Sequence, residues 1–537
     1  MHRARPGGAI VARVVAPAGC ALALSVALWA LGAAAPGDRV SSVRDERQPI
    51  ADLGNGTYRN PVLAGEYPDP SVVRVGPDYY MTHTPGPAAP ALLVWHSRDL
   101  VNWEPLGPAL SSSVGDIWAP DIGWHDGRFY IYFPARIRGA GGGDHRTNYV
   151  VTAKDPAGPW SAPVDLGLGG IDPGHVVDTS GRRYLYLDDG RVARLSDDGL
   201  RATSAPSKVY DGWDIPADWN IECKCLESPK LFFRRGYYYL VSAEGGTAGP
   251  STSHMVIVAR SPSPEGPWQN MPGNPLLRTR TRAERWWSQG HGTIIEAADG
   301  TWWIVFHAFE NGYRTLGRQT LLLPVAWTAD GWPEVPADAA TARTWTKPVG
   351  ANVGHGLPLS DAFTAPWAGW QWRHPGDVGA GPFTAGSGEW RVRATGAGSA
   401  DAAMQWVLPV NHSYEAQVEV EAPPGVEAGV LLHYDRDNFA GAGMASGRVF
   451  AILRGRPRDE VGLPPGATRV FLKVRNIEHD VELLHSADGL AWTRFETGLD
   501  MSGYHHDTFP DWQTLKIALY AAGDGTAVFR GFTYRGR

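Results

Sequence analysis

Four acidic residues and one histidine stand at corresponding points of a repeated pattern in this sequence. Asp69, Asp121, Asp172, Glu227 and His291 each precede a glycine-led aromatic segment by six to nine residues. Carboxylates that gather in one place raise one another's pKa, so one can hold a proton while another is ionised. Such a pair performs general acid and base chemistry: the acid protonates a leaving oxygen and the base takes a proton from water. Alternatively, these are ordinary acids at turns and strand ends, where Asp is common.

The repeat that carries these residues predicts the architecture. A glycine followed by aromatic and branched residues recurs at Gly76, Gly127, Gly181, Gly236 and Gly300, at intervals of 51, 54, 55 and 64 residues. Such runs are typical of strands, and units of about 50 residues with several strands each are typical of propeller blades. We therefore predict a five-bladed β-propeller, with a pair of β-sandwiches as the alternative. Because innermost propeller strands line the central channel, the five residues would converge there.

Length and composition limit the remaining classes. The 537 residues exceed what one compact core holds, so two folded units are the expectation. The formal charge of −7 offers no basic surface, and we expect no nucleic-acid partner. The 23 Trp and 19 Tyr permit carbohydrate binding, because aromatic faces stack on sugar rings. The sequence has no serine-nucleophile elbow, P-loop or dinucleotide glycine motif at a strand-to-helix junction.

A series of short motifs in fixed order resembles a known family. The motifs are Asn60-Pro61-Val62-Leu63, Tyr67-Pro68-Asp69-Pro70-Ser71, Trp118-Ala119-Pro120-Asp121, Gly170-Ile171-Asp172-Pro173, Glu227-Ser228-Pro229-Lys230, Gly290-His291-Gly292 and Gly317-Arg318-Gln319. This ordered set is similar to glycoside hydrolase family 43. The resemblance implies a five-bladed propeller that hydrolyses β-D-xylosides, α-L-arabinofuranosides or related plant cell-wall linkages with inversion.

The resemblance also implies roles for individual residues. Asp69 corresponds to the general base, Asp172 to the acid that modulates the pKa of its neighbour, and Glu227 to the general acid. Ser228 stands where the family commonly has Gly, which adds a side chain beside the acid. Asp121 occupies a variable position, so we expect it to bind a sugar hydroxyl, or alternatively to share the modulating role with Asp172.

Further residues are candidates for contact with substrate or metal. In the family's pattern Arg318 reaches the substrate in the first subsite, and its planar guanidinium suits neighbouring hydroxyls; a structural ion pair is the alternative. Trp118, Trp286 and Trp287 are candidate sugar platforms or blade packing. In many relatives the histidine matching His291 faces a calcium ion, so a structural calcium is an open expectation. No cofactor is expected to be required for the reaction.

The N-terminal segment predicts export. Residues 1–38 hold a basic start, an apolar run over residues 20–31 and then small residues. This is the order of a signal peptide, with an uncleaved membrane anchor as the alternative. We expect a secreted, extracellular protein that meets a membrane only if this segment stays attached. Cys223 and Cys225 then remain, either as thiols or as a local disulfide.

The mature chain is predicted to have two domains. We expect an N-terminal linker at 39–58, the propeller catalytic domain at 59–347, a glycine-rich linker at 348–359 and an antiparallel β-sandwich at 360–537. The last part has many short strands separated by turn signals and resembles the concanavalin-like sandwich of family 43 β-xylosidases. Its role stays open between closing the active-site pocket, binding polysaccharide and packing on the propeller.

These observations together predict a function. We expect an inverting exo-glycosidase that releases terminal β-D-xylosyl or α-L-arabinofuranosyl units from xylan- or arabinan-derived oligosaccharides. The alternatives are a non-catalytic carbohydrate-binding propeller and an endo-acting arabinan or xylan hydrolase of the same fold. The binding protein would need the aromatic residues but not an intact acid and base.

Overall fold

The structure is a computed structural model that describes residues 42–537 apart from 140–142, 368, 377–381 and 510–511. The expected signal peptide, residues 1–38, lies outside the described residues. Within the described part the regular elements are strands and three short 3-10 turns, Asp188–Gly190, Arg314–Leu316 and Ser399–Asp401. No helix there is long and apolar enough to cross a membrane. The all-β prediction is confirmed.

Five antiparallel sheets follow one another along the first part of the chain. The first holds β2 (Ser71–Val75), β3 (Asp78–Thr82), β5 (Ala91–Ser97) and β6 (Glu104–Leu110). The second holds β7 (Asp116–Ile117), β8 (Asp121–His125), β9 (Arg128–Arg138), β10 (Asp144–Ala153) and β11 (Val164–Asp165). The third holds β12 (Gly174–Val177), β13 (Arg183–Leu187), β14 (Arg191–Arg194) and β15 (Ser207–Lys208). The fourth holds β16 (Glu227–Arg234), β17 (Tyr237–Glu244), β18 (Met255–Ser261), β19 (Gln269–Asn270) and β20 (Leu277–Arg278), and the fifth β21 (Trp286–Glu296), β22 (Trp302–Glu310), β23 (Arg318–Trp327) and β24 (Pro333–Glu334).

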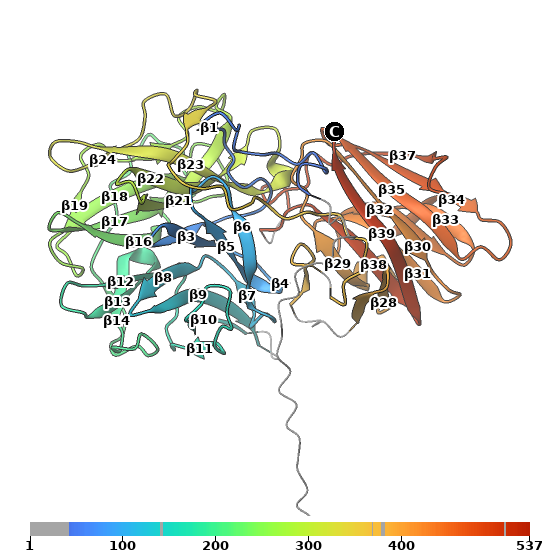
Figure 1. Cartoon of the computed structure of the whole chain (residues 1–537), viewed down its shortest axis with the longest axis horizontal. Helices are drawn as coiled ribbons and strands as arrows, with labels where there is room; N and C mark the ends of the chain where they lie inside the picture. The colour runs from blue at the N-terminus through green and yellow to red at the C-terminus, as the bar shows by residue number, and fades with distance from the viewer. Residues whose placement is uncertain (1–41, 140–142, 368, 377–381, 510–511) are drawn as a thin grey trace, which may run out of the picture. The chain divides into compact units, whose positions relative to one another are not determined.

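One strand from each sheet takes part in a closed ring, which is the arrangement of a five-bladed propeller. β2 contacts β8, β8 contacts β12, β12 contacts β16, β16 contacts β21, and β21 returns to β2. The blade strands are those coloured blue to yellow in Figure 1. Asp121 and Glu227 begin their ring strands, Asp69 and Asp172 precede theirs by two residues, and His291 lies within β21. The ring therefore brings the repeat positions toward one axis.

The composition of the aromatic strands follows from burial on both faces. In β13 all five residues are buried; Tyr184 and Tyr186 pack in one hydrophobic cluster, while Leu185 and Leu187 pack in another. Successive strand residues point to opposite faces, so a strand between two neighbouring blades needs apolar residues on both faces, as residues 184–187 provide. The glycine before such strands is needed for the turn, since Gly236 has a φ of 88° that other residues rarely adopt.

The C-terminal part is a β-sandwich of two antiparallel sheets, as predicted. One sheet has the order β27 (Phe383–Gly386), β28 (Glu389–Arg393), β39 (Thr526–Gly536), β30 (Tyr414–Glu421), β35 (Arg469–Ile477), β36 (Asp480–Ser486) and β37 (Thr493–Asp500). The other has the order β29 (Ala403–Val407), β38 (Lys516–Gly523), β31 (Val426–His433), β32 (Phe439–Ala445), β33 (Arg448–Leu453) and β34 (Arg456–Gly462). Alternate residues of β30 are buried, and Val418 and Val420 enter the core between the sheets. These strands are orange to red in Figure 1.

The segments expected as linkers are packed against the domains. Glu46 is buried, and its carboxylate accepts hydrogen bonds from the backbone amides of Leu359 at 2.9 Å and Ser360 at 2.7 Å. In addition, β1 (Thr57–Tyr58) pairs with β25 (Trp345–Thr346), which fastens the start of the propeller to its end. These contacts join residues about 300 positions apart, and composition alone does not report them.

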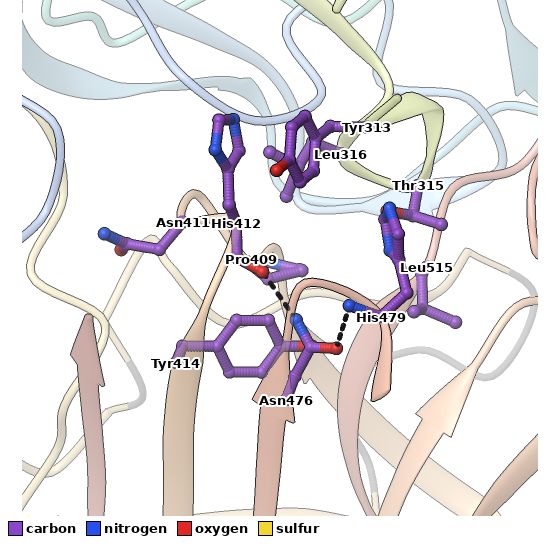
Figure 2. A pocket seen from close by; sticks show the side chains of 10 residues that line it. All are labelled: Tyr313, Thr315, Leu316, Pro409, Asn411, His412, Tyr414, Asn476, His479 and Leu515. Carbon is purple, nitrogen blue, oxygen red and sulfur yellow. Dashed lines mark hydrogen bonds between the residues drawn. The ribbon is translucent and has the colours of Figure 1, made fainter. Parts of the chain in front are cut away.

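Propeller and sandwich residues also meet directly. β4 (Ala88–Ala89), from the first blade's segment, pairs with β26 (His374–Pro375) ahead of the sandwich. Figure 2 shows a small pocket at which Tyr313 of the propeller faces His412 and His479 of the sandwich. The His412 ring stacks on Tyr313 with ring centroids 3.5 Å apart, and Nε2 of His479 lies 2.6 Å from the carbonyl oxygen of Gly312.

Candidate active site

Three of the residues at corresponding positions of the repeat have an unusual backbone conformation. Asp69, Asp172 and His291 have left-handed φ angles of 56°, 54° and 47°. Residues other than glycine adopt this region rarely, and such strain concentrates at functional sites. The same conformation at three equivalent places indicates that the fold holds the backbone there to place these side chains.

His291 is the centre of the cluster. Its Nδ1 lies 3.3 Å from Oδ1 of Asp69, and its Nε2 lies 3.2 Å from Oε1 of Glu227 and 3.6 Å from Oδ2 of Asp172. Burial by itself lowers the pKa of an imidazole, but the three carboxylates outweigh it and raise the pKa of His291 to about 9. At pH 7 the ring therefore carries a positive charge among three acids.

Asp69 is held in its ionised form. Its Oδ1 accepts a hydrogen bond from Arg318 at 2.9 Å, its Oδ2 accepts one from Thr84 at 2.5 Å, and Nδ1 of His307 lies 3.0 Å from Oδ1. Burial raises the pKa of this carboxyl, but the charges of Arg318 and His291 and the contact with His307 outweigh burial. The pKa of Asp69 is consequently well below its usual range, which suits a group that must accept a proton.

Asp172 and Glu227 are driven in opposite directions. Burial and the charges of Glu227 and Asp69 raise the pKa of Asp172 to about 7, against the opposing effect of His291. Burial also favours a neutral Glu227, but the contacts with His254 and His291 outweigh it and lower the pKa of Glu227 to about 2. Asp172 therefore holds a proton more readily than Glu227, and His291 is protonated at pH 7. A general acid needs a raised pKa, whereas the histidine contacts lower that of Glu227 in this structure.

Two further histidines were not identified from the sequence. His254 and His307 are fully buried, and their ring centroids lie 5.5 Å and 5.2 Å from that of His291. Nε2 of His254 lies 3.5 Å from Oε1 of Glu227, while Nδ1 of His307 lies 3.1 Å from the backbone nitrogen of Asp69. Gly290 permits this packing, because a Cβ there would lie 2.1 Å from the His254 ring.

Asp121 is committed to protein partners. Its Oδ1 lies 2.9 Å from Nζ of Lys230 and accepts a hydrogen bond from Ser71, and its Oδ2 accepts one from the His175 amide. Both side chains of the Asp121–Lys230 pair are nearly buried, and Lys230 also donates to the carbonyl of Pro120. The sugar-binding role expected for Asp121 has no support from these contacts, because both of its carboxylate oxygens are engaged by protein groups.

The predicted substrate-binding residues lie in different surroundings. Arg318 lies between two acids, donating to Asp69 and holding its Nε 3.6 Å from Oε1 of Glu66. Trp118 is half-buried under the guanidinium of Arg146, 4.5 Å from the ring centroid. Trp287 is also half-buried, with the Arg314 guanidinium 5.2 Å from its ring. The two tryptophans therefore have one face occupied by a cation.

A sandwich segment reaches the rim of the cluster. Trp512, with 47% of its surface exposed, lies with its ring centroid 5.7 Å from the Arg318 guanidinium. His506 stacks between Trp512 and Phe309, and Asp507 forms an ion pair with Arg314 of the propeller. Of the three roles left open for the sandwich, these contacts favour a loop that closes the site.

Cys223 and Cys225 form a disulfide, with Cα atoms 5.3 Å apart. The bond lies two residues before Glu227 and beside Glu222. Burial and the charge of Glu227 raise the pKa of Glu222. Of the two sequence-based alternatives for the cysteines, the local disulfide is the one found.

The side chains around His291 do not form a calcium cage. Among the described residues, the one group that offers converging metal ligands is Glu227, His254 and His291, whose ligand atoms lie within 4.8 Å of one another. Calcium takes six to eight oxygen ligands, whereas this set offers two imidazoles and one carboxylate. The residues present do not fit the expected ion, and no chemical step below uses one.

The chain matches a known sequence family. The model of the family described as glycosyl hydrolases family 43 matches residues 58–333, which is just over half of the chain. That range begins at the first strand of the propeller and ends at the last blade. It includes His291 and the three carboxylates that contact it, Asp69, Asp172 and Glu227.

Individual relatives extend this likeness. An enzyme named non-reducing end α-L-arabinofuranosidase BoGH43B from Bacteroides ovatus is 34% identical over 340 residues, covering 60% of this chain and 61% of that protein. A xylan 1,3-β-xylosidase from a Vibrio species is 33% identical over 344 residues, covering 56% and 60%. The chain thus spans about three fifths of the length of these curated relatives. A crystal structure of the GH43 protein BlXynB from Bacillus licheniformis matches with a TM-score of 0.79 at 28% identity, covering 89% of this chain and 99% of that one.

Proposed function

The chain belongs to glycosyl hydrolases family 43, and we propose that it is a glycosidase that uses Asp69 as general base and Glu227 as general acid. The observation that carries the proposal is the contact of one protonated histidine with three buried carboxylates of unequal pKa. Groups whose surroundings separate their pKa values divide the acid and base roles between them.

In the proposed reaction Asp69 takes a proton from a water molecule whose oxygen bonds to the anomeric carbon. Glu227 gives its proton to the glycosidic oxygen as the bond to the leaving group breaks. A sugar over the cluster excludes water, which raises the pKa of Glu227. The proton it then needs is within reach, because Nε2 of the protonated His291 lies 3.2 Å from its Oε1. Asp172, with its pKa raised to about 7, is the neighbour that keeps a second proton in the cluster.

We propose inversion at the anomeric carbon. Oδ1 of Asp69 contacts one nitrogen of the His291 ring, and Oε1 of Glu227 contacts the other. The imidazole therefore lies between the two carboxylates and separates their oxygens. Inverting pairs stand about 6.5–9.5 Å apart to leave room for a water, whereas retaining pairs stand about 5–5.5 Å apart. The contact of Asp69 with Arg318 and Thr84 keeps it ionised, as a base acting on water requires.

The proposed substrates are terminal β-D-xylosyl or α-L-arabinofuranosyl units on xylan- or arabinan-derived oligosaccharides. Support comes from the names of the relatives in Bacteroides and Vibrio. We propose exo action because the segment with Trp512 and Asp507 lies against Arg318 and Arg314, where it would obstruct a continuous chain. Secretion is proposed from the signal-like residues 1–38.

The test is release of nitrophenol from aryl β-D-xyloside and aryl α-L-arabinofuranoside. Asp69→Asn and Glu227→Gln should each reduce kcat/KM by about 10²–10⁴-fold, while the exposed Asp197→Asn should leave it unchanged. Proton NMR of the first product should show the inverted anomer. A folded protein that binds xylan or arabinan without releasing nitrophenol, or variants as active as the parent, would refute the proposal.

A further inference from the structure

A cavity lies beside two residues that hydrogen-bond to Asp69. Its lining includes Glu66, Thr84, Arg318, Arg373 and Trp512, from both the propeller and the sandwich region. Thr84 and Arg318 each donate a hydrogen bond to the Asp69 carboxylate, at 2.5 Å and 2.9 Å. The cavity therefore shares a wall with the proposed base but does not include the acid.

Arg373 is the unusual member of this lining. Its backbone is fixed by reciprocal hydrogen bonds with Trp406, at 2.9 Å and 2.8 Å. Its guanidinium forms no hydrogen bond or ion pair with another residue in the part of the chain that the structure describes, although it borders two cavities. Burial lowers the pKa of Arg373, against the effects of Tyr67 and Glu66. The Arg373 side chain is half-buried, so its N–H donors face the two cavities without a protein acceptor and can be met by an acceptor from outside the protein.

The neighbouring charged groups are already engaged. Oε2 of Glu66 accepts the backbone amide of Arg318 at 2.7 Å. Nζ of Lys516 donates to the carbonyls of Tyr434 and Thr514 and to the side chain of Gln513. The cavity lining thus contains two arginines, Arg318 and Arg373, against one acid, Glu66, while burial lowers the pKa of Lys516 to about 7. This excess of positive charge favours an anion from outside the protein.

We propose that this cavity binds the carboxylate of an acidic sugar, with Arg373 as its partner and Trp512 as the platform for the ring. A guanidinium and a carboxylate match in a paired, bidentate geometry, and an indole face stacks on the apolar face of a sugar. Almost half of the Trp512 surface is exposed for such contact. The inference rests on the proposed function, because it places a uronic acid next to the base that acts on the neighbouring sugar.

The test measures binding without turnover, so it is independent of the proposed hydrolysis. Calorimetry on the Glu227→Gln protein would compare sodium D-glucuronate, D-glucose and sodium acetate. We expect the affinity for D-glucuronate to be on the order of tenfold higher than that for D-glucose or acetate. This is the affinity that one charge-assisted hydrogen-bond contact contributes. Arg373→Gln should remove this preference, Arg373→Lys should keep part of it, and the exposed Arg391→Gln should keep all of it.

Three results would overturn the inference. They are equal affinity for D-glucuronate and D-glucose, acetate binding as tightly as D-glucuronate, or a preference that survives Arg373→Gln. Circular dichroism and the melting temperature would establish that each variant is folded. If aryl glycosides were not hydrolysed while D-glucuronate still bound through Arg373, the proposed function would fail and the anion site would stand.

Discussion

The Nε2 atom of His291 lies 3.2 Å from Oε1 of Glu227, which places the positive charge of a buried imidazole against the proposed acid. This contact and the contact of His254 with Glu227 both lower the pKa of Glu227, and together they outweigh the opposing effect of burial. His291 is in turn kept protonated by the carboxylates around it. The acid is therefore ionised with its proton stored one hydrogen bond away.

His291→Gln should raise the pKa of Glu227. The substitution removes the charge that favours the carboxylate, so burial then dominates and favours the neutral acid. We expect the ionisation of Glu227, followed by carbon-13 NMR of labelled glutamate, to move upward by more than one pH unit. We also expect kcat to fall by about 10²-fold, because the stored proton is lost. The exposed His145→Gln is the matched control. An unchanged titration of Glu227 would contradict the role of His291.

Arg318→Gln should move the acidic limb of the kcat/KM profile toward neutral pH. Asp69 has a pKa well below its usual range because Arg318 and His291 outweigh burial. Without the guanidinium the pKa of Asp69 rises, so the base becomes protonated, and inactive, at a higher pH than in the parent. In Arg318→Lys the acidic limb should stay close to its position in the parent, because the positive charge beside Asp69 remains. A profile of Arg318→Gln that is scaled down but not shifted would mean that Arg318 acts on substrate binding alone.

The propeller could be predicted from the sequence because each blade is marked by a pattern of residues that are close together in the chain. Each blade begins with a turn glycine and an aromatic strand buried on both faces, as β13 illustrates, and such local patterns repeat visibly. The acidic residues at the same offset were found together for that reason. Asp69, Asp172, Glu227 and His291 do lie together, as the ring geometry requires.

The remainder of the site depends on contacts that no local pattern encodes. His254 precedes β18 and His307 lies in β22, outside the offset that marked the other residues. They reach the cluster only through sheet register and the space that Gly290 leaves. Asp121 lies at the same offset as the other acids, but its carboxylate forms an ion pair with Lys230, which comes from two blades further along the chain. Arg373 lies between the domains, and its unmet guanidinium is visible only once both are placed.

Gly290→Ala should disrupt the histidine cluster. A Cβ at this position would lie 2.1 Å from the His254 ring, so the ring or strand β21 must move. Overpacking of this kind costs about 1–3 kcal/mol of folding free energy. We expect a lower melting temperature and a loss of activity greater than that of His254→Gln, since the strand also carries His291. Gly273→Ala, where a Cβ meets nothing within 4 Å, is the control. Equal stability and activity of the two variants would contradict the packing argument.

Glu310→Gln should destabilise the protein more at neutral pH than at low pH. Glu310 is buried, and its carboxylate lies 2.8 Å from Nε2 of His412 in the sandwich and 2.9 Å from Nε of Arg285. Burial raises the pKa of Glu310, but His412 and Arg285 outweigh it and lower the pKa. A carboxyl with a folded-state pKa below its unfolded value of about 4.3 stabilises the fold above that pH. That contribution is lost as the pH falls through the folded-state pKa.

The expected difference in unfolding free energy is about 1–3 kcal/mol at pH 7, because a buried carboxylate that contacts Arg285 and His412 is removed. Urea unfolding of parent and Glu310→Gln at pH 7 and at pH 3 would measure it, and the difference between the two curves should be smaller at the lower pH. Glu460→Gln removes an exposed partner of Arg448 in the sandwich and should change neither curve. A destabilisation of Glu310→Gln that persists undiminished at pH 3 would mean that shape, and not charge, joins His412 to the propeller.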